Sequence, residues 1–229
     1  MKYHVDLDID LKRNPYKGLY IALEGIDGAG KTTQVDKLSK FFKKKGKKVV
    51  TTREPRKDGV LGELTHQILT SKVKFPSTAI QYLFSADRVI HHETIVKPAL
   101  ASGKVVITDR CFWSAIVYGV LDRMEKNYNR ESVDFLLITQ SILSMYHQFI
   151  VPDISFYLKI SVNSSLGRIK EKSEKELYET RTKIEKAFDG YEWLTDKFKK
   201  EITVIDGEKE EGIVTGDMLK VIEEKGYKI

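Results

Sequence analysis

Eight consecutive residues, Gly25 to Thr32, read Gly-Ile-Asp-Gly-Ala-Gly-Lys-Thr and match the spacing G-x-x-x-x-G-K-[ST]. In such a loop, glycines let successive backbone N–H groups turn toward phosphate oxygens, and the helix that follows presents its positive end to them. Lys31 adds a positive charge, and Thr32 offers a hydroxyl oxygen to Mg²⁺. The pattern predicts a site for a nucleoside triphosphate; a glycine-rich turn that only joins a strand to a helix is the alternative. The expected contacts are Gly25, Ile26, Asp27, Gly28, Ala29, Gly30, Lys31, Thr32 and Thr33.

Apolar runs rich in β-branched residues alternate along the chain with longer helical patterns. The candidate strands are 19–23, 49–52, 104–108, 154–160 and 202–205, and the candidate helices are 31–45, 61–71, 77–102, 112–126, 131–148, 163–172, 177–200 and 212–225. Strands that alternate with helices build a parallel sheet with helices on both faces. The sequence therefore predicts an α/β fold in three layers, of the P-loop NTPase type, with a five-stranded parallel sheet.

The segment 133–150 is strongly apolar, and we expect it to be buried on more than one side. Two packing arrangements would bury the helix in this way. The helix could pack against the chain's own sheet, or it could join the helix at 77–102 in packing against a second subunit.

Charged residues stand at the ends of two further predicted strands, and open α/β sheets bind their ligands at this carboxyl edge. Arg53 follows the second strand, and Asp109 and Arg110 follow the third. An acidic residue directly after an apolar strand is typical of a group that holds a metal, so Asp109 is expected to share Mg²⁺ with Thr32. Phosphoryl transfer needs cations from several directions, and Arg110 is expected to face an acceptor phosphate.

Phe84 and Arg88 are four residues apart in a helical pattern and therefore share one face. An aromatic ring and a guanidinium on one face can stack on a base and donate to its carbonyl oxygen. Plain core packing explains Phe84 equally well from these residues alone.

Length and composition describe one globular domain. Of the 229 residues, 41% are hydrophobic and 31% are charged, and no apolar run approaches the roughly 20 residues of a membrane helix. We expect a single domain at 18–229 and an N-terminal extension at 1–17, where apolar residues alternate with aspartates as in an extra strand. No membrane contact is expected, and the expected location is cytoplasmic.

The net charge of +6 suits polyanionic ligands, which include nucleotides and nucleic acid. Lysines alternate with glutamates at 170–186, without the interleaved aromatic residues of a stacking platform. We interpret these lysines as solvated helix faces, so a nucleic-acid partner is not expected. The single cysteine, Cys111, excludes an intrachain disulfide and a metal-thiolate cluster.

Several motifs occur together and in order. They are residues 21–34, Thr52-Arg53-Glu54-Pro55, Leu83-Phe84-Ser85-Ala86-Asp87-Arg88, Asp109-Arg110 with Ser114 and Tyr118, and Pro152-Asp153. The set resembles the thymidylate kinase family from about Lys17 to the C-terminus. The resemblance implies transfer of the γ-phosphate of ATP to dTMP, Mg²⁺ as cofactor, a homodimer, and a mobile lid at about 168–181 that closes over the site.

The resemblance also implies roles for the matching residues. Phe84 would stack on the thymine and Arg88 would donate to a thymine carbonyl. Arg53 and Arg110 would hold the phosphate of dTMP. Asp27 would contact the sugar 3′-hydroxyl, and Tyr118 would crowd the 2′-carbon and favour deoxyribose. The substrate-binding set is Asp27, Arg53, Phe84, Arg88, Arg110, Ser114 and Tyr118; the catalytic set is Lys31, Asp27 and Arg110, with Arg168 and Arg181 as the lid's candidates for the γ-phosphate.

Three positions depart from the family pattern. The sequence 176–179 lacks the arginine that often precedes Tyr-Glu, Cys111 replaces a common aromatic residue, and Gly119 stands where a glutamine is frequent. Two alternatives remain open from the sequence. One is a related nucleoside or nucleoside-monophosphate kinase with another acceptor, and the other is a non-catalytic nucleotide-binding module.

Overall fold

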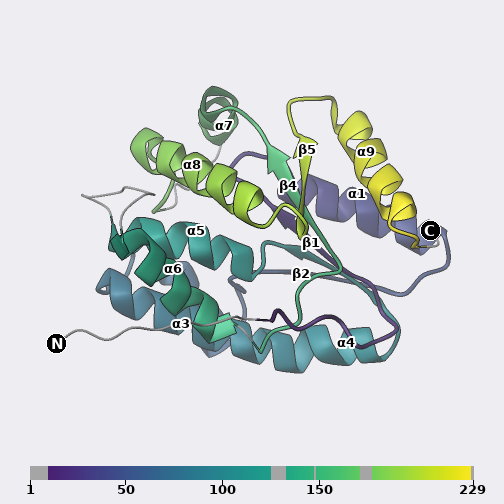
Figure 1. The fold of residues 1–229 in the computed structure, drawn as a ribbon, viewed down its shortest axis with the longest axis horizontal. Coiled ribbons are helices and arrows are strands. Elements are labelled where there is room, and N and C mark those ends of the chain that lie inside the picture. The colour runs from purple at the N-terminus through teal and green to yellow at the C-terminus, as the bar shows by residue number, and fades with distance from the viewer. Residues whose placement is uncertain (1–9, 125–132, 147, 171–176, 228–229) are drawn as a thin grey trace.

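The computed structural model describes residues 10–124, 133–146, 148–170 and 177–227. Five strands form one all-parallel sheet in the order β2-β3-β1-β4-β5 (Figure 1). Their bounds are β1 Tyr20–Glu24, β2 Val49–Arg53, β3 Val105–Asp109, β4 Ile154–Lys159 and β5 Ile202–Asp206. The predicted parallel sheet is confirmed, because each described strand begins and ends within one residue of its expected bounds.

Helices cover both faces of the sheet (Figure 1). On one face lie α1 Lys31–Lys44 and α9 Glu211–Glu224; on the other lie α3 Ser77–His91, α4 Lys97–Ala101, α5 Phe112–Arg123 and α8 Arg181–Lys197. The other described helices are α2 Gly59–Leu69, the π-helix η1 His92–Val96, α6 Val133–Tyr146 and α7 Val162–Ile169. Crossovers between parallel strands are right-handed. The chain crosses the sheet in one direction from β1 to β2 and in the opposite direction from β2 through β3 and β4 to β5, so the helices of these two sets of connections lie on opposite faces. The three-layer α/β architecture is thereby confirmed.

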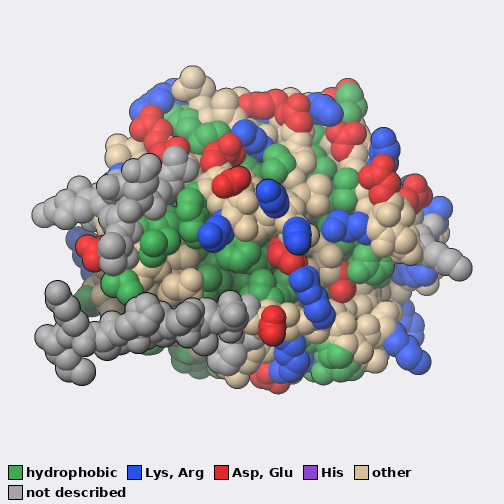
Figure 2. Space-filling view, viewed as in Figure 1, with side chains coloured by type: hydrophobic (Ala, Val, Ile, Leu, Met, Phe, Trp, Pro, Cys, Tyr) green, Lys and Arg blue, Asp and Glu red, His purple; other side chains and the backbone are tan. Residues whose placement is uncertain are grey.

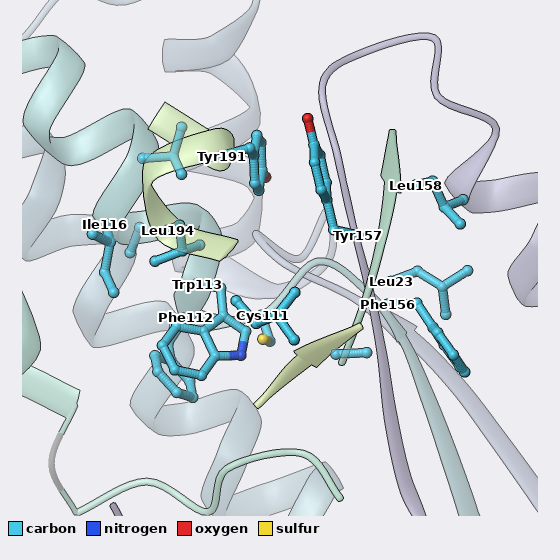
Figure 3. Close-up of a cluster of buried hydrophobic side chains, with 14 of the residues drawn as sticks. Leu23, Cys111, Phe112, Trp113, Ile116, Phe156, Tyr157, Leu158, Tyr191 and Leu194 are labelled. Carbon is cyan, nitrogen blue, oxygen red and sulfur yellow. The ribbon is translucent and has the colours of Figure 1, made fainter. Parts of the chain in front are cut away.

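Burial on both faces explains why the strands are continuous apolar runs rather than alternating ones. All five residues of β1 are buried, as are all five of β3. On the α5 and α8 side, the ring of Tyr157 from β4 stacks on Tyr191 from α8, with ring centroids 5.0 Å apart (Figure 3). Trp113 of α5 packs in the same cluster, and its indole N–H donates to the Ser155 hydroxyl over 3.0 Å. This packed sheet holds the ends of β1 and β3 in fixed positions.

The predicted helix at 77–102 is one helical segment with a wider turn inside it. α3, η1 and α4 follow one another without a break over 77–101, and the π-helical turn immediately precedes the turn that contains Pro98. Proline has no N–H to donate within a helix and clashes with the preceding turn, and a π-bulge is one way to accommodate such a residue.

The expectation that 133–150 is buried on more than one side is wrong. Phe135, Ile142 and Tyr146 of α6 are buried, whereas Leu136 and Leu137 are 51% and 58% exposed. Neighbouring helices cover only one side of α6, so the leucines on its other side face outward. The predicted helix 177–200 begins only at Arg181.

The N-terminal alternation falls mostly outside the described residues, where its strand assignment is untested. Within them, Lys12 forms an isolated parallel bridge with Ile150. In the parts of the chain that the structure describes, no helix combines the length and the apolar character that a membrane crossing needs. On the face drawn in Figure 2, lysine and arginine side chains are interspersed with aspartates and glutamates rather than gathered in one basic patch.

Candidate active site

The loops after β1, β2 and β3 open into one cleft of about 990 Å³. These strands are adjacent and parallel, so the residues that follow them meet at one edge of the sheet. The cleft brings together most of the predicted site residues: Asp27, Gly28, Ala29, Gly30, Lys31, Thr32, Thr33, Arg53, Phe84, Arg88, Asp109, Arg110, Ser114, Tyr118 and Arg168. Its lining does not include Gly25, Ile26 or Arg181.

The loop between β1 and α1 has a backbone that only glycine adopts readily. Gly25, Gly28 and Gly30 have φ angles of 146°, 80° and 87°. At Gly28, an added Cβ would also lie 3.0 Å from the carbonyl oxygen of Ser165 in α7. α1 begins at Lys31, directly after the loop, so its positive end faces the cleft. This arrangement suits bound phosphate groups.

The Lys31 ammonium lies inside the loop. Its Nζ donates to the carbonyl oxygens of Gly25 and Ile26, at 3.1 and 3.0 Å. Burial, reinforced by the positive charge of Arg110, lowers the pKa of Lys31 to about 8. Lys31 is therefore still mostly protonated at neutral pH, and it is a poorly solvated cation for which a phosphate oxygen is a better partner than two neutral carbonyls.

Thr32 and Asp109 lie side by side at the start of α1 and the end of β3. The Thr32 hydroxyl donates to Asp109 Oδ2 over 2.5 Å. Hydroxyl and carboxylate oxygens are hard ligands, and Mg²⁺ in nucleotide sites uses one or two such protein groups together with substrate phosphates. The described residues contain no cluster of three or more His, Cys, Asp or Glu side chains that could hold a metal without such a substrate. The pair therefore fits Mg²⁺ bound to a nucleotide.

Arg110 connects the end of β3 to the phosphate loop. Its φ of 72° lies in the left-handed region, which a non-glycine residue occupies only when surrounding contacts enforce it. Its Nη2 donates to Asp27 Oδ1 over 2.6 Å, and its Nη1 donates to the carbonyl oxygen of Gly25 over 2.9 Å. Nη1 also lies 3.2 Å from the Ser114 hydroxyl and 3.0 Å from the Tyr191 hydroxyl. These contacts fix one guanidinium between the loop and α5.

Glu24, the last residue of β1, lies behind Arg110 and is fully buried. Its carboxylate accepts hydrogen bonds from the Cys111 backbone N–H at 2.8 Å, the Ser114 hydroxyl at 2.5 Å and the Tyr191 hydroxyl at 2.8 Å. A buried carboxylate requires such donors. Glu24 therefore holds the start of α5 in place, together with two hydroxyls that contact Arg110.

Phe84 and Arg88 lie on one face of α3, as the spacing predicts, and both line the cleft. The Arg88 guanidinium is held from behind by an ion pair with Glu54 and by a 2.8 Å hydrogen bond from Nη1 to the Tyr146 hydroxyl. Arg88 is only 3% exposed, so its side chain is a fixed donor in the cleft wall rather than a surface group.

Tyr118 of α5 lines the cleft. The Arg110 guanidinium carbon lies 5.1 Å from the centre of the Tyr118 ring, and the Tyr178 ring centre lies 4.8 Å away on another side. Arg53 lines the cleft at the end of β2, and its buried Nε has no hydrogen-bond partner among the described residues. A guanidinium N–H in this state suits an anionic ligand.

The two arginines expected to belong to a lid occupy different places. Arg168 lines the cleft, and its guanidinium donates to the carbonyl oxygens of Gly28 and Gly207, at 3.1 and 3.4 Å. The Arg181 side chain is 59% exposed and contacts Glu185 and Asn163. Residues 171–176 of the expected lid lie outside the described residues.

Four residues that shape the cleft received no role from the sequence: Glu24, Glu54, Gln81 and Tyr191. Glu54 lies in the segment that the carboxyl-edge rule selects, although the rule gives it no role, and Glu24 could have been found because it ends the apolar strand β1 as Asp109 ends β3. Gln81 and Tyr191 lie within ordinary helical patterns and gave no signal.

The cleft lining contains cations in two places that suit anionic ligands. The loop at 25–33 fits a donor triphosphate, and Arg53 and Arg110, which also line the cleft, suit a second phosphate. A P-loop protein that holds two phosphorylated ligands in one cleft belongs to the class of nucleotide kinases.

Comparison with known proteins identifies the family. The family model described as thymidylate kinase matches residues 23–217. A thymidylate kinase of Sulfurihydrogenibium sp. is 33% identical over 192 residues, which cover 83% of this chain and 89% of the relative. A probable thymidylate kinase of Pyrococcus horikoshii is 38% identical over 67% of this chain and 71% of the relative. The chain therefore belongs to the thymidylate kinase family.

A solved structure supports the fold. A thymidylate kinase from Candida albicans superimposes with a TM-score of 0.75 at 23% identity, over 90% of this chain and 92% of that one. The family inferred from the motifs is thus confirmed, and with it an enzyme that phosphorylates dTMP at the expense of ATP.

Proposed function

We propose that the cleft described above is where the γ-phosphate of ATP passes to dTMP, with ATP on the loop at 25–33 and dTMP between α3 and α5. The observation that carries this placement is Arg110. Its guanidinium contacts Asp27 and Gly25 of the ATP loop and lies over the ring of Tyr118 on the acceptor side. One fixed cation between two phosphates is what an in-line transfer needs.

On the donor side, Lys31 and the backbone N–H groups of the loop bind the phosphates of ATP. Thr32 and Asp109 hold Mg²⁺, which neutralises phosphate charge when it is bound. Arg168 is the lid residue that reaches the γ-phosphate, because it already lines the cleft beside Gly28.

On the acceptor side, Arg53 and Arg110 bind the phosphate of dTMP. Phe84 stacks on the thymine and Arg88 donates to a thymine carbonyl. Asp27 contacts the sugar 3′-hydroxyl, Tyr118 excludes a 2′-hydroxyl, and Ser114 orients Arg110 through its hydroxyl.

The attacking atom is a phosphate oxygen of dTMP, which is already ionised at neutral pH, so the transfer needs no strong general base. The residues of the cleft therefore act by positioning the two phosphates and stabilising the charge between them. Closure of the lid excludes water, which would otherwise accept the phosphoryl group.

The test is release of ADP from ATP and Mg²⁺ with a panel of acceptors: dTMP, dUMP, UMP, CMP, AMP, GMP and thymidine. Strong preference for dTMP is expected. Preference for another acceptor would retain the kinase but overturn the base pocket, and ATP binding without acceptor-dependent turnover would favour a non-catalytic binding module.

The active form is a homodimer in this proposal, and it works in the cytoplasm, where its nucleotides are available. The support for a dimer is a set of exposed apolar side chains on α3 and α6: Tyr82, Val89, Ile90, Leu136 and Leu137. The two helices contact each other, since the Ser85 hydroxyl lies 2.7 Å from the Tyr146 hydroxyl. Such residues are enriched at the core of protein interfaces.

A further inference from the structure

Gln81 is a buried amide in the wall of the cleft. It lies on α3, three residues before Phe84 and seven before Arg88, so the three side chains share one face of the helix. Gln81 is only 1% exposed, and its Oε1 atom has no hydrogen-bond partner among the described residues. Buried acceptors are nearly always paired, because an unpaired one carries a free-energy penalty. A ligand in the cleft would relieve that penalty.

The orientation of the Gln81 amide is fixed by α5. Its Nε2 faces Asp122 Oδ2 at 3.4 Å, and the same carboxylate oxygen accepts a 2.6 Å hydrogen bond from the Tyr178 hydroxyl. A carboxylate accepts and does not donate, so the NH₂ group must point toward Asp122. The carbonyl oxygen is therefore the atom that Gln81 has left for a ligand.

Gly119 makes room for this amide. A Cβ at position 119 would lie 2.8 Å from both Cδ and Oε1 of Gln81, and 2.7 Å from Cδ1 of Ile142. These distances are too short for any larger residue while Gln81 and Ile142 keep their positions. The absence of the glutamine that is frequent at this position thus has a structural reason, since an amide from α3 occupies the space.

The unpaired acceptor matches a specific need of the substrate. A thymine base carries two carbonyl acceptors and one ring donor, the N3–H group. Arg88 only donates, so it serves a carbonyl, and Ala115 on the facing helix lines the cleft without a polar group. On the placement of dTMP proposed above, we infer that Gln81 Oε1 accepts the hydrogen bond from thymine N3–H. Gln81 is then a specificity-determining residue, because cytosine presents an acceptor at N3 and would face the Gln81 oxygen unpaired.

The first test replaces Gln81 with Met, which has a similar shape and no strong acceptor. The KM for dTMP is expected to rise about tenfold, as for the loss of one hydrogen bond, while the KM for ATP stays the same. Because dCMP no longer meets the acceptor, the preference in kcat/KM for dTMP over dCMP falls about tenfold or more. The melting temperature of the free enzyme changes little, since the variant removes an unpaired buried oxygen together with only a long, 3.4 Å contact to Asp122.

The matched control is Gln34→Met. Gln34 is also buried and also lines the cleft, but its Oε1 accepts from Thr215 and its Nε2 donates to the carbonyl oxygen of Glu211. Its amide is therefore fully engaged with α9. The control variant is expected to lose thermal stability and to keep the wild-type preference for dTMP over dCMP.

A second variant tests the orientation without removing the amide. In Asp122→Asn, the new side chain can donate to Gln81, which allows the Gln81 NH₂ group to turn toward the base. The preference for dTMP over dCMP is again expected to fall. Wild-type preference in both Gln81→Met and Asp122→Asn would overturn the inference, even if dTMP remains the substrate. A wild-type enzyme that does not use dTMP would instead overturn the proposed function.

Discussion

Arg88 and Glu54 form an ion pair in which only 4% and 3% of the two side chains are exposed. Glu54 Oε1 also lies 2.9 Å from His91 Nδ1, and His91 Nε2 lies 2.7 Å from the Thr52 hydroxyl. Burial of two charges costs free energy that their attraction offsets only with good geometry, so such a pair is a poor stabiliser. The pair does fix the direction of the Arg88 guanidinium, and Arg88 lines the cleft together with Phe84.

Arg88→Ala is expected to raise the KM for dTMP about 10- to 100-fold, the loss of a charged hydrogen bond to the base. The KM for ATP should not change, because ATP binds at the other end of the cleft. The variant leaves Glu54 buried without its arginine and with only His91 as a partner, which destabilises the fold by up to about 3–5 kcal/mol. Steady-state kinetics and thermal unfolding measure the two effects.

The double variant Arg88→Met with Glu54→Gln separates these effects. It removes both charges, so most of the stability should return, while the KM for dTMP stays high. A KM that recovers with the stability would show that Arg88 acts only as a structural residue.

Glu54 is expected to make the fold sensitive to acid. Burial by itself would raise the pKa of Glu54, but Arg88 and His91 more than offset this, and its pKa lies below the usual 4.5. A carboxylate with a lowered pKa in the folded state stabilises the protein above the unfolded-state pKa, and this contribution disappears as the pH falls through the folded-state pKa. In urea unfolding, the stability difference between the wild-type enzyme and Glu54→Gln should therefore be constant from pH 6 to pH 5 and should shrink below about pH 4.5. Glu54→Gln should decline less over the same range, and an equal decline would assign the acid sensitivity to other carboxylates.

The fold could be predicted almost completely, because its signals are local. Strands buried on both faces are apolar runs, and the helix after the phosphate loop begins where the glycines end. The carboxyl-edge rule then placed Asp109, Arg110 and Arg53 in one cleft, as the structure shows. Long-range contacts were harder to predict. The Tyr191 hydroxyl contacts Glu24, 167 residues away in sequence, and no periodicity distinguishes such a tyrosine from one that only fills the core.

Two failures have the same physical origin. The composition of α6 indicates strong burial, but exposure depends on how many neighbours surround the helix, and the described residues leave Leu136 and Leu137 about half exposed. For Gln81 the residue type misleads in the opposite direction. A polar residue in a helix suggests an exposed position, but Gln81 is buried. In both cases the tertiary arrangement, rather than the residue type, decides exposure.

The apolar surface on α6 gives a prediction about assembly. Leu137→Glu is expected to convert the proposed dimer to a monomer, because a carboxylate in an interface loses its water without gaining a partner. Size-exclusion chromatography with light scattering measures the mass directly. Ile213→Glu is the matched control, since Ile213 is also an exposed apolar residue, at 52%, but lies on α9. Loss of the dimer in both variants, or in neither, would contradict an interface formed by α3 and α6.

Arg168 and Arg181, the two arginines of the proposed lid, give a paired prediction. Arg168→Ala is expected to lower kcat about 100- to 1,000-fold, the effect of removing a donor that stabilises the developing charge. Arg181→Ala is expected to change kcat by less than about threefold, because its side chain is exposed and lies outside the cleft lining. Single-turnover measurements would compare the chemical step in the two variants. The reverse order would show that closure of the lid brings Arg181, and not Arg168, to the γ-phosphate.

Lys31 gives a prediction about pH. In the free enzyme, burial lowers its pKa to about 8, and ATP needs the protonated form. The Kd for ATP should therefore be nearly constant between pH 7 and pH 7.5 and rise above about pH 8, by up to tenfold per unit. Lys31→Arg provides the control, because a guanidinium stays protonated throughout this range. The Kd of the Lys31→Arg variant for ATP should not vary with pH. An equal rise of the Kd in this variant would assign the titration to another group.

The lowered pKa of Lys31 also means that the unfolded chain binds more protons than the folded chain between about pH 8 and the usual lysine value of 10.5. The stability contribution of Lys31 should accordingly increase with pH over that interval, opposite in direction to its effect on ATP binding.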